Sequence, residues 1–250
     1  SESGKSHWWT VRVLCTQCSV FGLRHHVMMM STKMMTMVMV VMVVAILQPP
    51  LTSAANIFTA FTRGFERQEE IQTLALNKGR GWESREVPSK VWVCTGQQRS
   101  ASDGQITSAE QMRAFLRLFA YLNGRNSKDQ ELPMGKPVSI EVKTAADGSR
   151  ELNACFFLPE RIQADPPTPT DPLVFLSQRP TLTIFTRKFG GFASDEETWM
   201  TEAQGLKGVL TAEGIDTRGD LQYWNAYDPP HKFWSRRNEV WLVKPDEEQA

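Results

Sequence analysis

The sequence predicts an α+β domain in which a ββαββ unit occurs twice. Helix-start signals at Thr107 and Ser194 lie 87 residues apart (107 to 194), and the glycines that end the two helices, Gly124 and Gly214, lie 90 residues apart. Segments with the two-residue alternation of strands flank each expected helix. The near-equal spacing indicates an internal duplication with a pseudo-twofold relation. Since neither unit alone can bury both a sheet face and a helix face, we expect one domain.

The composition is that of a globular protein without surplus positive charge. Of 250 residues, 41% are hydrophobic and 22% charged, with a formal net charge of zero, which suits a packed core. The first 55 residues hold four Lys/Arg and one Asp/Glu, so the remainder carries 24 against 27, a net charge of −3. Nucleic-acid binding depends on neutralising phosphates, so we expect no nucleic-acid partner. The sequence also lacks a polybasic patch of the kind that binds membrane surfaces.

Residues 28–55 have the pattern of a secretory signal peptide. Lys33 supplies positive charge, Met34–Leu47 is an apolar stretch of 14 residues, and small residues suited to cleavage follow at 52–55. A permanent membrane anchor is the alternative, but a span needs roughly 20 apolar residues. A buried core helix fits poorly because the stretch lacks a polar face.

We therefore expect cleavage near Ala54 or Ala55 and secretion of a domain that begins at residue 56 and runs to 250. The alternative location is the cytoplasm, if translation skips the signal. Residues 1–27 precede the expected signal peptide and do not begin with Met. We interpret them as translated upstream sequence or a gene-prediction artefact.

The first repeat, at about 71–164, places a helix between two strand pairs. Its expected strands are Ile71–Leu76, Trp82–Thr95, Pro137–Lys143 and Glu151–Leu158. The helix begins with a capping box, in which the Thr107 hydroxyl caps the backbone N–H of Glu110 and the glutamate reciprocates. The apolar positions at helical spacing are Met112, Phe115, Leu116, Leu118, Phe119 and Leu122. Such a stripe normally faces a core.

The second repeat, at about 173–244, follows a proline-rich connector at 165–172. Its expected strands are Leu173–Ser177, Thr181–Lys188, Leu221–Tyr227 and Glu239–Val243. Ser194 and Glu197 form a second predicted capping box. The apolar positions of the helix that follows are Trp199, Ala203, Leu206 and Leu210.

Two cysteines, Cys94 and Cys155, would remain after cleavage of the signal peptide. An even pair in an oxidising compartment can form a disulfide, which here would close a loop of about 60 residues. The alternative is two buried free thiols, which behave as small hydrophobic groups. A disulfide requires the two Cα atoms to lie within about 7 Å.

The loop between the last two expected strands, Tyr227–Asn238, combines stiffness, aromatic rings and positive charge. Pro229 and Pro230 restrict its backbone. The loop also contains His231, Lys232, Phe233, Trp234, Arg236 and Arg237. Flat apolar rings and cations on a stiff backbone suit a planar, amphipathic anion, and we place the function here.

Four stretches in order carry a family resemblance: WESREVPSKVWV (82–93), LPMGKPV (132–138), RKFGGFA (187–193) and YDPPHKFWSRRNEVWLVK (227–244). They resemble motifs of the SOUL/haem-binding protein family, in which a YDPP loop runs into RRNE. The resemblance covers about residues 72–244. It implies a twisted antiparallel β-barrel flanked by two helices, and reversible binding of haem or another porphyrin.

In that family the first helix and the loop matching Tyr227–Asn238 line a shallow haem-binding cleft. The helix residues that the resemblance implies are Met112, Arg113, Phe115, Leu116, Arg117 and Phe119. The loop residues are His231, Lys232, Phe233, Trp234 and Arg236. Apolar side chains would face the porphyrin, and cations would pair with its propionates. As the one imidazole left after cleavage, His231 is the candidate axial iron ligand; a solvated loop histidine is the alternative.

Other function classes find less support. The sequence contains no G-x-S-x-G, P-loop, HExxH or dinucleotide-binding turn. Glu239 stands beside Arg236 and Arg237, where an ion-paired structural role fits better than acid–base catalysis. We therefore expect a monomeric binding protein for haem carriage or buffering, and no enzyme. A protein-interaction module of the SOUL type, without physiological haem binding, is the competing hypothesis.

Overall fold

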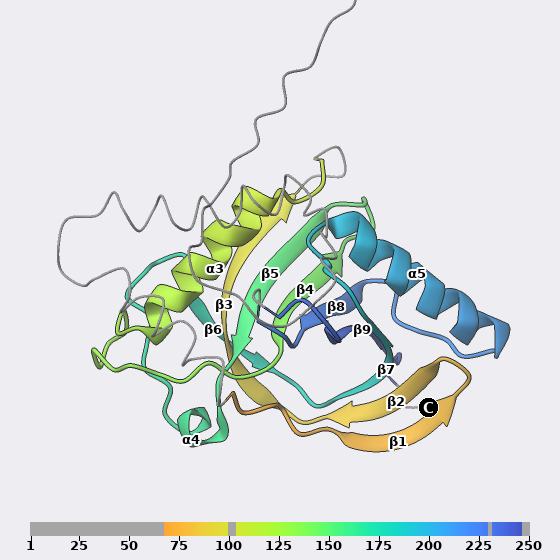
Figure 1. Ribbon diagram of the computed structural model, residues 1–250, viewed down its shortest axis with the longest axis horizontal. Helices are drawn as coiled ribbons and strands as arrows, with labels where there is room; N and C mark the ends of the chain where they lie inside the picture. Colours follow the sequence, from red (N-terminus) through yellow and green to blue (C-terminus); the bar gives the residue numbers. More distant parts are fainter. Residues whose placement is uncertain (1–67, 100–103, 230–231, 247–250) are drawn as a thin grey trace, which may run out of the picture. The chain divides into compact units, whose positions relative to one another are not determined.

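The structure is a computed structural model that describes residues 68–99, 104–229 and 232–246 (Figure 1). These residues belong to one of two compact units of the chain, Ala55–Ala250. The predicted signal peptide and the residues before it lie outside the described part. Within the described part, no helix is both long enough and apolar enough to cross a membrane.

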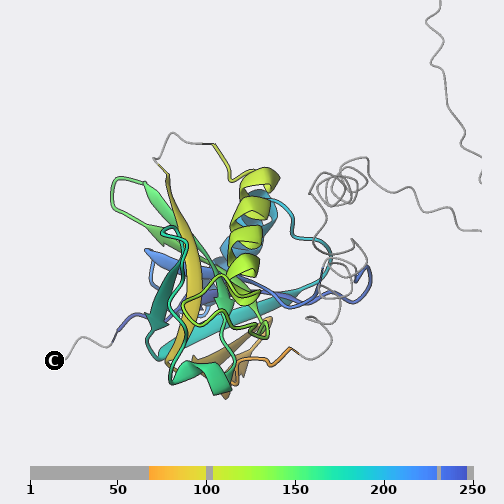
Figure 2. The ribbon, with the colours of Figure 1, turned by 90° about the vertical axis from the view of Figure 1, so that its left-hand side faces the viewer.

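The described strands form one antiparallel sheet that curls into a half-barrel, which confirms the predicted α+β class and twisted antiparallel architecture (Figure 1). The strands are β1 (Leu74–Gly79), β2 (Trp82–Val87), β3 (Lys90–Arg99), β4 (Val138–Thr144), β5 (Arg150–Phe157), β6 (Phe175–Arg179), β7 (Leu182–Phe189), β8 (Leu221–Ala226) and β9 (Asn238–Val243). The helices are α3 (Ser108–Leu122), α4 (Glu160–Gln163) and α5 (Glu196–Ala212). Figures 1 and 2 show α3 and α5 on the same face of the sheet.

The strand order is symmetric about the pairing of β4 with β8. From β2 onward, the order is β2-β7-β9-β8-β4-β5-β3-β6, with β1 added at one edge. Exchanging β2 with β6, β3 with β7, β4 with β8 and β5 with β9 gives the same order, read from the opposite end of the sheet. The two corresponding units are therefore β2-β3-α3-β4-β5 and β6-β7-α5-β8-β9, a pattern that an internal duplication predicts.

The start of α3 matches its sequence signal. Thr107 is the N-cap, its hydroxyl accepts a hydrogen bond from the Glu110 backbone N–H, and the Glu110 carboxylate accepts one from the Thr107 N–H. The hydrogen bonds from Thr107 hold the pKa of Glu110 down at about 2. The predicted capping box is therefore confirmed.

The start of α5 differs by one residue from the prediction. Asp195, rather than Ser194, has the extended backbone of an N-cap, and its carboxylate accepts hydrogen bonds from the backbone and hydroxyl of Thr198. Ser194 and Asp195 are adjacent, and serine and aspartate are comparable caps, so the local pattern alone does not choose between them. The predicted end is correct, since Gly214 has a positive φ of 72° just after the helix.

The stretch Trp82–Thr95, predicted as one strand, is divided between β2 and β3. Pro88 has no backbone N–H to donate, and it stands at the break. β2 pairs with β7, whereas β3 pairs with β5 and β6. At this break the chain therefore passes from the β1 end of the strand order to the β6 end.

The two faces of the sheet have different cores. On the helix side, α5 packs Trp199 and Leu206 against strand residues such as Trp224, and α3 packs Leu118 against β3 and β5. On the inner side, residues of β2, β3, β5, β7, β8 and β9 meet in a separate cluster that includes Trp92. Because successive residues of a strand point to opposite faces, these six strands contribute to both cores.

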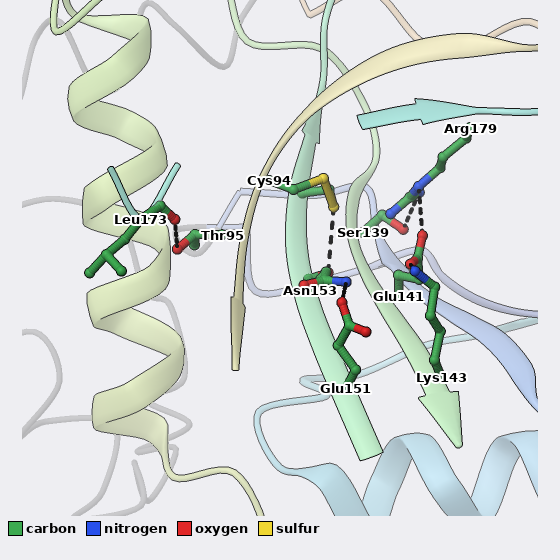
Figure 3. Close-up of a disulfide and its surroundings, with 10 residues drawn as sticks. Cys94, Thr95, Ser139, Glu141, Lys143, Glu151, Asn153, Leu173 and Arg179 are labelled. Atoms are coloured by element: carbon green, nitrogen blue, oxygen red, sulfur yellow. Dashed lines mark hydrogen bonds and ion pairs between the residues drawn. A yellow bond between two sulfur atoms is a disulfide. The ribbon is translucent and has the colours of Figure 1, made fainter. Parts of the chain in front are cut away.

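Cys94 of β3 and Cys155 of β5 form a disulfide, which confirms the predicted pairing. The two residues are directly opposite in the β3–β5 register, with Cα atoms 4.1 Å apart, and both are buried. Figure 3 shows the disulfide on the side of β3 away from α3, whereas Thr95 points toward α3 and donates to the Leu173 carbonyl. Closing a loop of 61 residues stabilises the fold by about 4 kcal/mol in the chain-entropy description.

A buried ion cluster around Glu239 closes the base of the β8–β9 loop. Glu239 has no exposed surface. Its carboxylate accepts hydrogen bonds of 3.0–3.1 Å from Arg85, Tyr227, Arg237 and Trp241. Burial alone would raise the pKa of Glu239, but the Trp241 hydrogen bond and the charges of Arg85 and Arg237 outweigh it, so the pKa is lowered. This arrangement agrees with the ion-paired role expected for Glu239.

We predict that Glu239→Gln lowers the free energy of unfolding by about 3 kcal/mol at pH 7, since two arginines lose a buried counter-charge. The pKa of Glu239 in the folded state lies below its unfolded value of about 4.3. Its contribution is therefore complete above that value and is lost as the pH falls through the folded-state pKa. Urea unfolding between pH 3 and 7 measures both effects, and the variant should lose part of the acid dependence.

The matched control is Glu160→Gln, which removes an ion pair between Lys90 and a carboxylate that is 65% exposed. An exposed pair contributes at most about 1 kcal/mol. Equal destabilisation by the two variants would show that the Glu239 cluster does not hold the fold.

Candidate functional site

The buried face of α3 is centred on Leu118, Tyr121 and Leu122. The sequence pattern identified Leu118 and Leu122 but not Tyr121. The Tyr121 hydroxyl donates to the Pro167 carbonyl at 2.9 Å, in the proline-rich connector. Tyr121 lies at helical spacing from Leu118, so the apolar pattern could have included it. Its hydrogen-bond acceptor, Pro167, lies too far along the chain for a local pattern to indicate.

A second, apolar flank of α3 reaches the surface. At 3.6 residues per turn, Met112, Leu116 and Phe119 follow one line along the helix. Leu116 is 50% exposed, and Met112 and Phe119 are half-buried. Phe115 lies between this flank and the core, with its ring stacked on Phe119 at 5.9 Å. Of the predicted apolar helix residues, Leu116 is therefore exposed, whereas Met112 and Phe119 are partly covered and Phe119 also packs against the core.

The two predicted arginines of α3 differ in their surroundings. Arg117 donates to the Thr95 hydroxyl at 3.1 Å and lies 3.5 Å from the Asp171 carboxylate. Its position is roughly 140° around the helix axis from Met112, so it faces the β3–β6 side. Arg113 is exposed, and no carboxylate of the described residues pairs with it.

In the β8–β9 loop, Arg236 is a structural link. Its guanidinium donates to the carbonyls of Pro229, Lys232 and Asp228 at 2.7, 2.8 and 3.1 Å. These bonds connect the two arms of the loop. Burial lowers the pKa of Arg236, and Asp228 only partly offsets it. Three of the N–H groups of this guanidinium therefore donate to backbone carbonyls of the loop.

Asp228 organises the other cations of the loop. Its carboxylate accepts a hydrogen bond from the Lys232 ammonium at 2.6 Å and another from the Arg237 backbone N–H. Burial would raise the pKa of Asp228, but these two hydrogen bonds outweigh it and the pKa is lowered. Arg237 pairs with Glu70 at 2.6 Å and stacks 3.7 Å above the Tyr227 ring. The sequence pattern did not identify Asp228 as the partner of Lys232.

The tip of the loop is aromatic and exposed. Phe233 is 47% exposed and Trp234 is 71% exposed. Phe192, in the connection between β7 and α5, is 42% exposed and lies 6.0 Å from Phe233 between ring centroids. Phe192 occurs in the RKFGGFA motif, but no local pattern indicates that its ring contacts the loop. The predicted iron ligand His231 lies outside the described residues.

The structure places α3 and the β8–β9 loop on the same side of the sheet (Figures 1 and 2). No hydrogen bond or ion pair joins α3 to the part of this loop that is described. A cavity of about 230 Å³ lies elsewhere, at the β4–β5 hairpin, where Lys143, Arg150 and Arg218 contribute to its lining. Among the described residues, no group of three or more His, Cys, Asp and Glu is arranged to hold a metal ion.

Comparisons with known proteins agree with the motifs. The family described as "SOUL heme-binding protein" matches residues 68–243. Heme-binding protein 1 of Mus musculus is 35% identical over 133 residues, which cover 52% of this chain and 70% of that protein. Heme-binding protein 1 of Xenopus tropicalis is 32% identical over 184 residues, covering 72% of this chain and 93% of that protein.

Heme-binding protein 2 of Homo sapiens is 29% identical over 168 residues, which cover 66% of this chain and 79% of that protein. The family match extends from the segment before β1 to the end of β9 and includes both α3 and the β8–β9 loop. Together with the nine-stranded half-barrel, these similarities establish that the chain belongs to the SOUL heme-binding protein family.

Proposed function

We propose that this domain binds haem or another tetrapyrrole reversibly, without catalysis, in a shallow apolar cleft between α3 and the Tyr227–Asn238 loop. Its role would be haem carriage or buffering. The observation that carries the proposal is that both elements leave large apolar side chains in solvent, with Leu116 at 50% and Trp234 at 71% exposure. Family membership and the names of the relatives support the same ligand class.

The chemistry of the residues fits this ligand. A porphyrin presents a flat apolar body, which Met112, Leu116 and the rings at the loop tip can cover. Its propionates require cations, and Arg113 is exposed without a carboxylate partner among the described residues. Lys232 would have to exchange its Asp228 partner for a propionate. The remaining predicted cations, Arg117 and Arg236, have protein partners.

We predict that Met112→Asp combined with Leu116→Asp weakens haemin binding at least tenfold. Burial of one leucine contributes roughly 1.5–3 kcal/mol, and about 1.4 kcal/mol is a tenfold change in affinity. The introduced carboxylates would also repel the propionates. A Soret-monitored haemin titration measures the affinity, and far-UV circular dichroism confirms the fold.

The matched control is Leu74→Asp with Leu76→Asp on β1, where the side chains are 61% and 49% exposed. This pair should bind haemin as the wild type does. Undiminished binding by the α3 variant would exclude the cleft, and a wild-type protein without a saturable Soret change would contradict haem binding itself.

We also propose His231 as the axial iron ligand, on the basis of its place in the loop sequence. His231→Ala is expected to shift the Soret band to shorter wavelength or weaken it, because an imidazole ligand sets the electronic state of the haem iron. The thermal unfolding temperature should not change. An identical spectrum for the variant and the wild type would remove His231 from the site.

We propose that the domain works outside the cytosol, after removal of the signal peptide. The buried Cys94–Cys155 disulfide supports this location, because such bonds persist in oxidising compartments. Expression from Met28 in eukaryotic cells should yield secreted protein that begins near Ala54 or Ala55. N-terminal sequencing identifies the start, and non-reducing mass spectrometry identifies the disulfide. Uncleaved protein in the cytosol would contradict the proposal.

Protein interaction remains the second candidate function, favoured by the exposure of Trp234 and Phe233 at a loop tip. Exposed aromatic side chains are frequent anchors of protein interfaces. Haemin titration separates the two functions. No saturable Soret change, together with a partner whose capture is lost in Trp234→Ala, would favour interaction over tetrapyrrole binding.

A further inference from the structure

Two loops that are distant in sequence meet at the aromatic tip. The Asn238 side-chain amide donates to the Gly191 carbonyl at 3.0 Å, which fixes the β7–α5 connection to the start of β9. Gly191 has a positive φ of 81°, a conformation that favours glycine. The next residue, Phe192, places its ring 6.0 Å from Phe233, with the planes tilted by 57°.

Arg236 connects the same two loops through a different contact. Its guanidinium carbon lies 4.5 Å from the centroid of the Phe192 ring, within cation–π distance. Its N–H groups meanwhile donate to three carbonyls of the β8–β9 loop. A planar guanidinium can stack on a ring and donate in its own plane at once, whereas a lysine ammonium cannot. Arg236 therefore holds Phe192 in place against the loop.

The resulting surface is apolar, and the cations near it are already paired with groups of the protein. Phe192, Phe233 and Trp234 are each more than two-fifths exposed, and exposed apolar clusters of this kind mark binding surfaces. The nearby cations, Lys232 and Arg236, are engaged by Asp228 and by backbone carbonyls. Charged groups of a ligand thus gain little binding free energy here, whereas a flat apolar ring can stack on the aromatic side chains.

We propose that Phe192 is a further ring of the surface that receives the apolar part of the tetrapyrrole, and that Arg236 positions this ring without contacting the propionates. The inference rests on the proposed function and deepens it. It also bears on the orientation of the ligand, since the propionates would then point away from the aromatic tip. Arg113 on α3, exposed and without a carboxylate partner among the described residues, is the candidate cation for them.

The first test compares Phe192→Ala with Phe175→Ala. Both phenylalanines are 42% exposed, but Phe175 lies on the edge strand β6. Loss of one stacking ring should weaken haemin affinity about fivefold, measured by quenching of tryptophan fluorescence and by the Soret change. Phe175→Ala should bind as the wild type does. If the wild type binds haemin and both variants match it, the role of Phe192 is wrong while the proposed function stands.

The second test uses Arg236→Lys with haemin and with haemin dimethyl ester, whose propionates carry no charge. A positioning residue affects both ligands by the same factor, because the ring it holds contacts the apolar part of each. A direct propionate ligand would affect haemin alone. Weakened binding of haemin with unchanged binding of the ester would therefore overturn the role assigned to Arg236. Failure of the wild type to bind either ligand would instead contradict the proposed function.

Discussion

The geometry of the β8–β9 loop depends on the hydrogen bonds and ion pairs made by the buried carboxylate of Glu239. This carboxylate joins Arg85 on β2 to Tyr227 and Arg237, the residues at the two ends of the loop. Burying a carboxylate is unfavourable unless its charge is paired and hydrogen-bonded, and here four side chains donate to it. Glu70 extends the cluster through Arg237. These contacts hold the base of the loop to the sheet, while the tip exposes Phe233 and Trp234.

The charges of the loop are satisfied within the protein, and this shapes how a ligand could be held. Lys232 pairs with Asp228, Arg236 binds backbone carbonyls, and Arg237 binds two glutamates. A ligand at the tip would therefore be held chiefly by apolar contact, with charge supplied from α3. Apolar contact on an open surface removes less ligand area from water than burial in an enclosed pocket does, so a ligand held in this way would dissociate more readily.

Local sequence signals predicted most of the elements, although not the short helix α4 or the break between β2 and β3. The contacts between elements required the fold. The capping box of Thr107 and Glu110 is readable because its partners lie three residues apart. Ser194 and Asp195 are adjacent and comparable as caps, so the local pattern does not choose between them. A cation such as Arg236 gives no sequence indication of whether it faces ligand or backbone. Phe192 stands about 40 residues before Phe233, and single-sequence patterns contain no information on that distant contact.

The two units related by the strand symmetry differ in how the hairpin is joined to the helix. The exchange that relates β4–β5 to β8–β9 also relates α3 to α5. The counterpart of the α3 and β8–β9 pair is therefore α5 with the β4–β5 hairpin. There, Arg150 of the hairpin pairs directly with Glu196, the buried first residue of α5. That ion pair joins the hairpin to the helix, and no equivalent pair joins α3 to the described part of the β8–β9 loop. The two units with the same strand topology thus differ at this connection, and the unit without the ion pair is the one whose loop exposes aromatic rings.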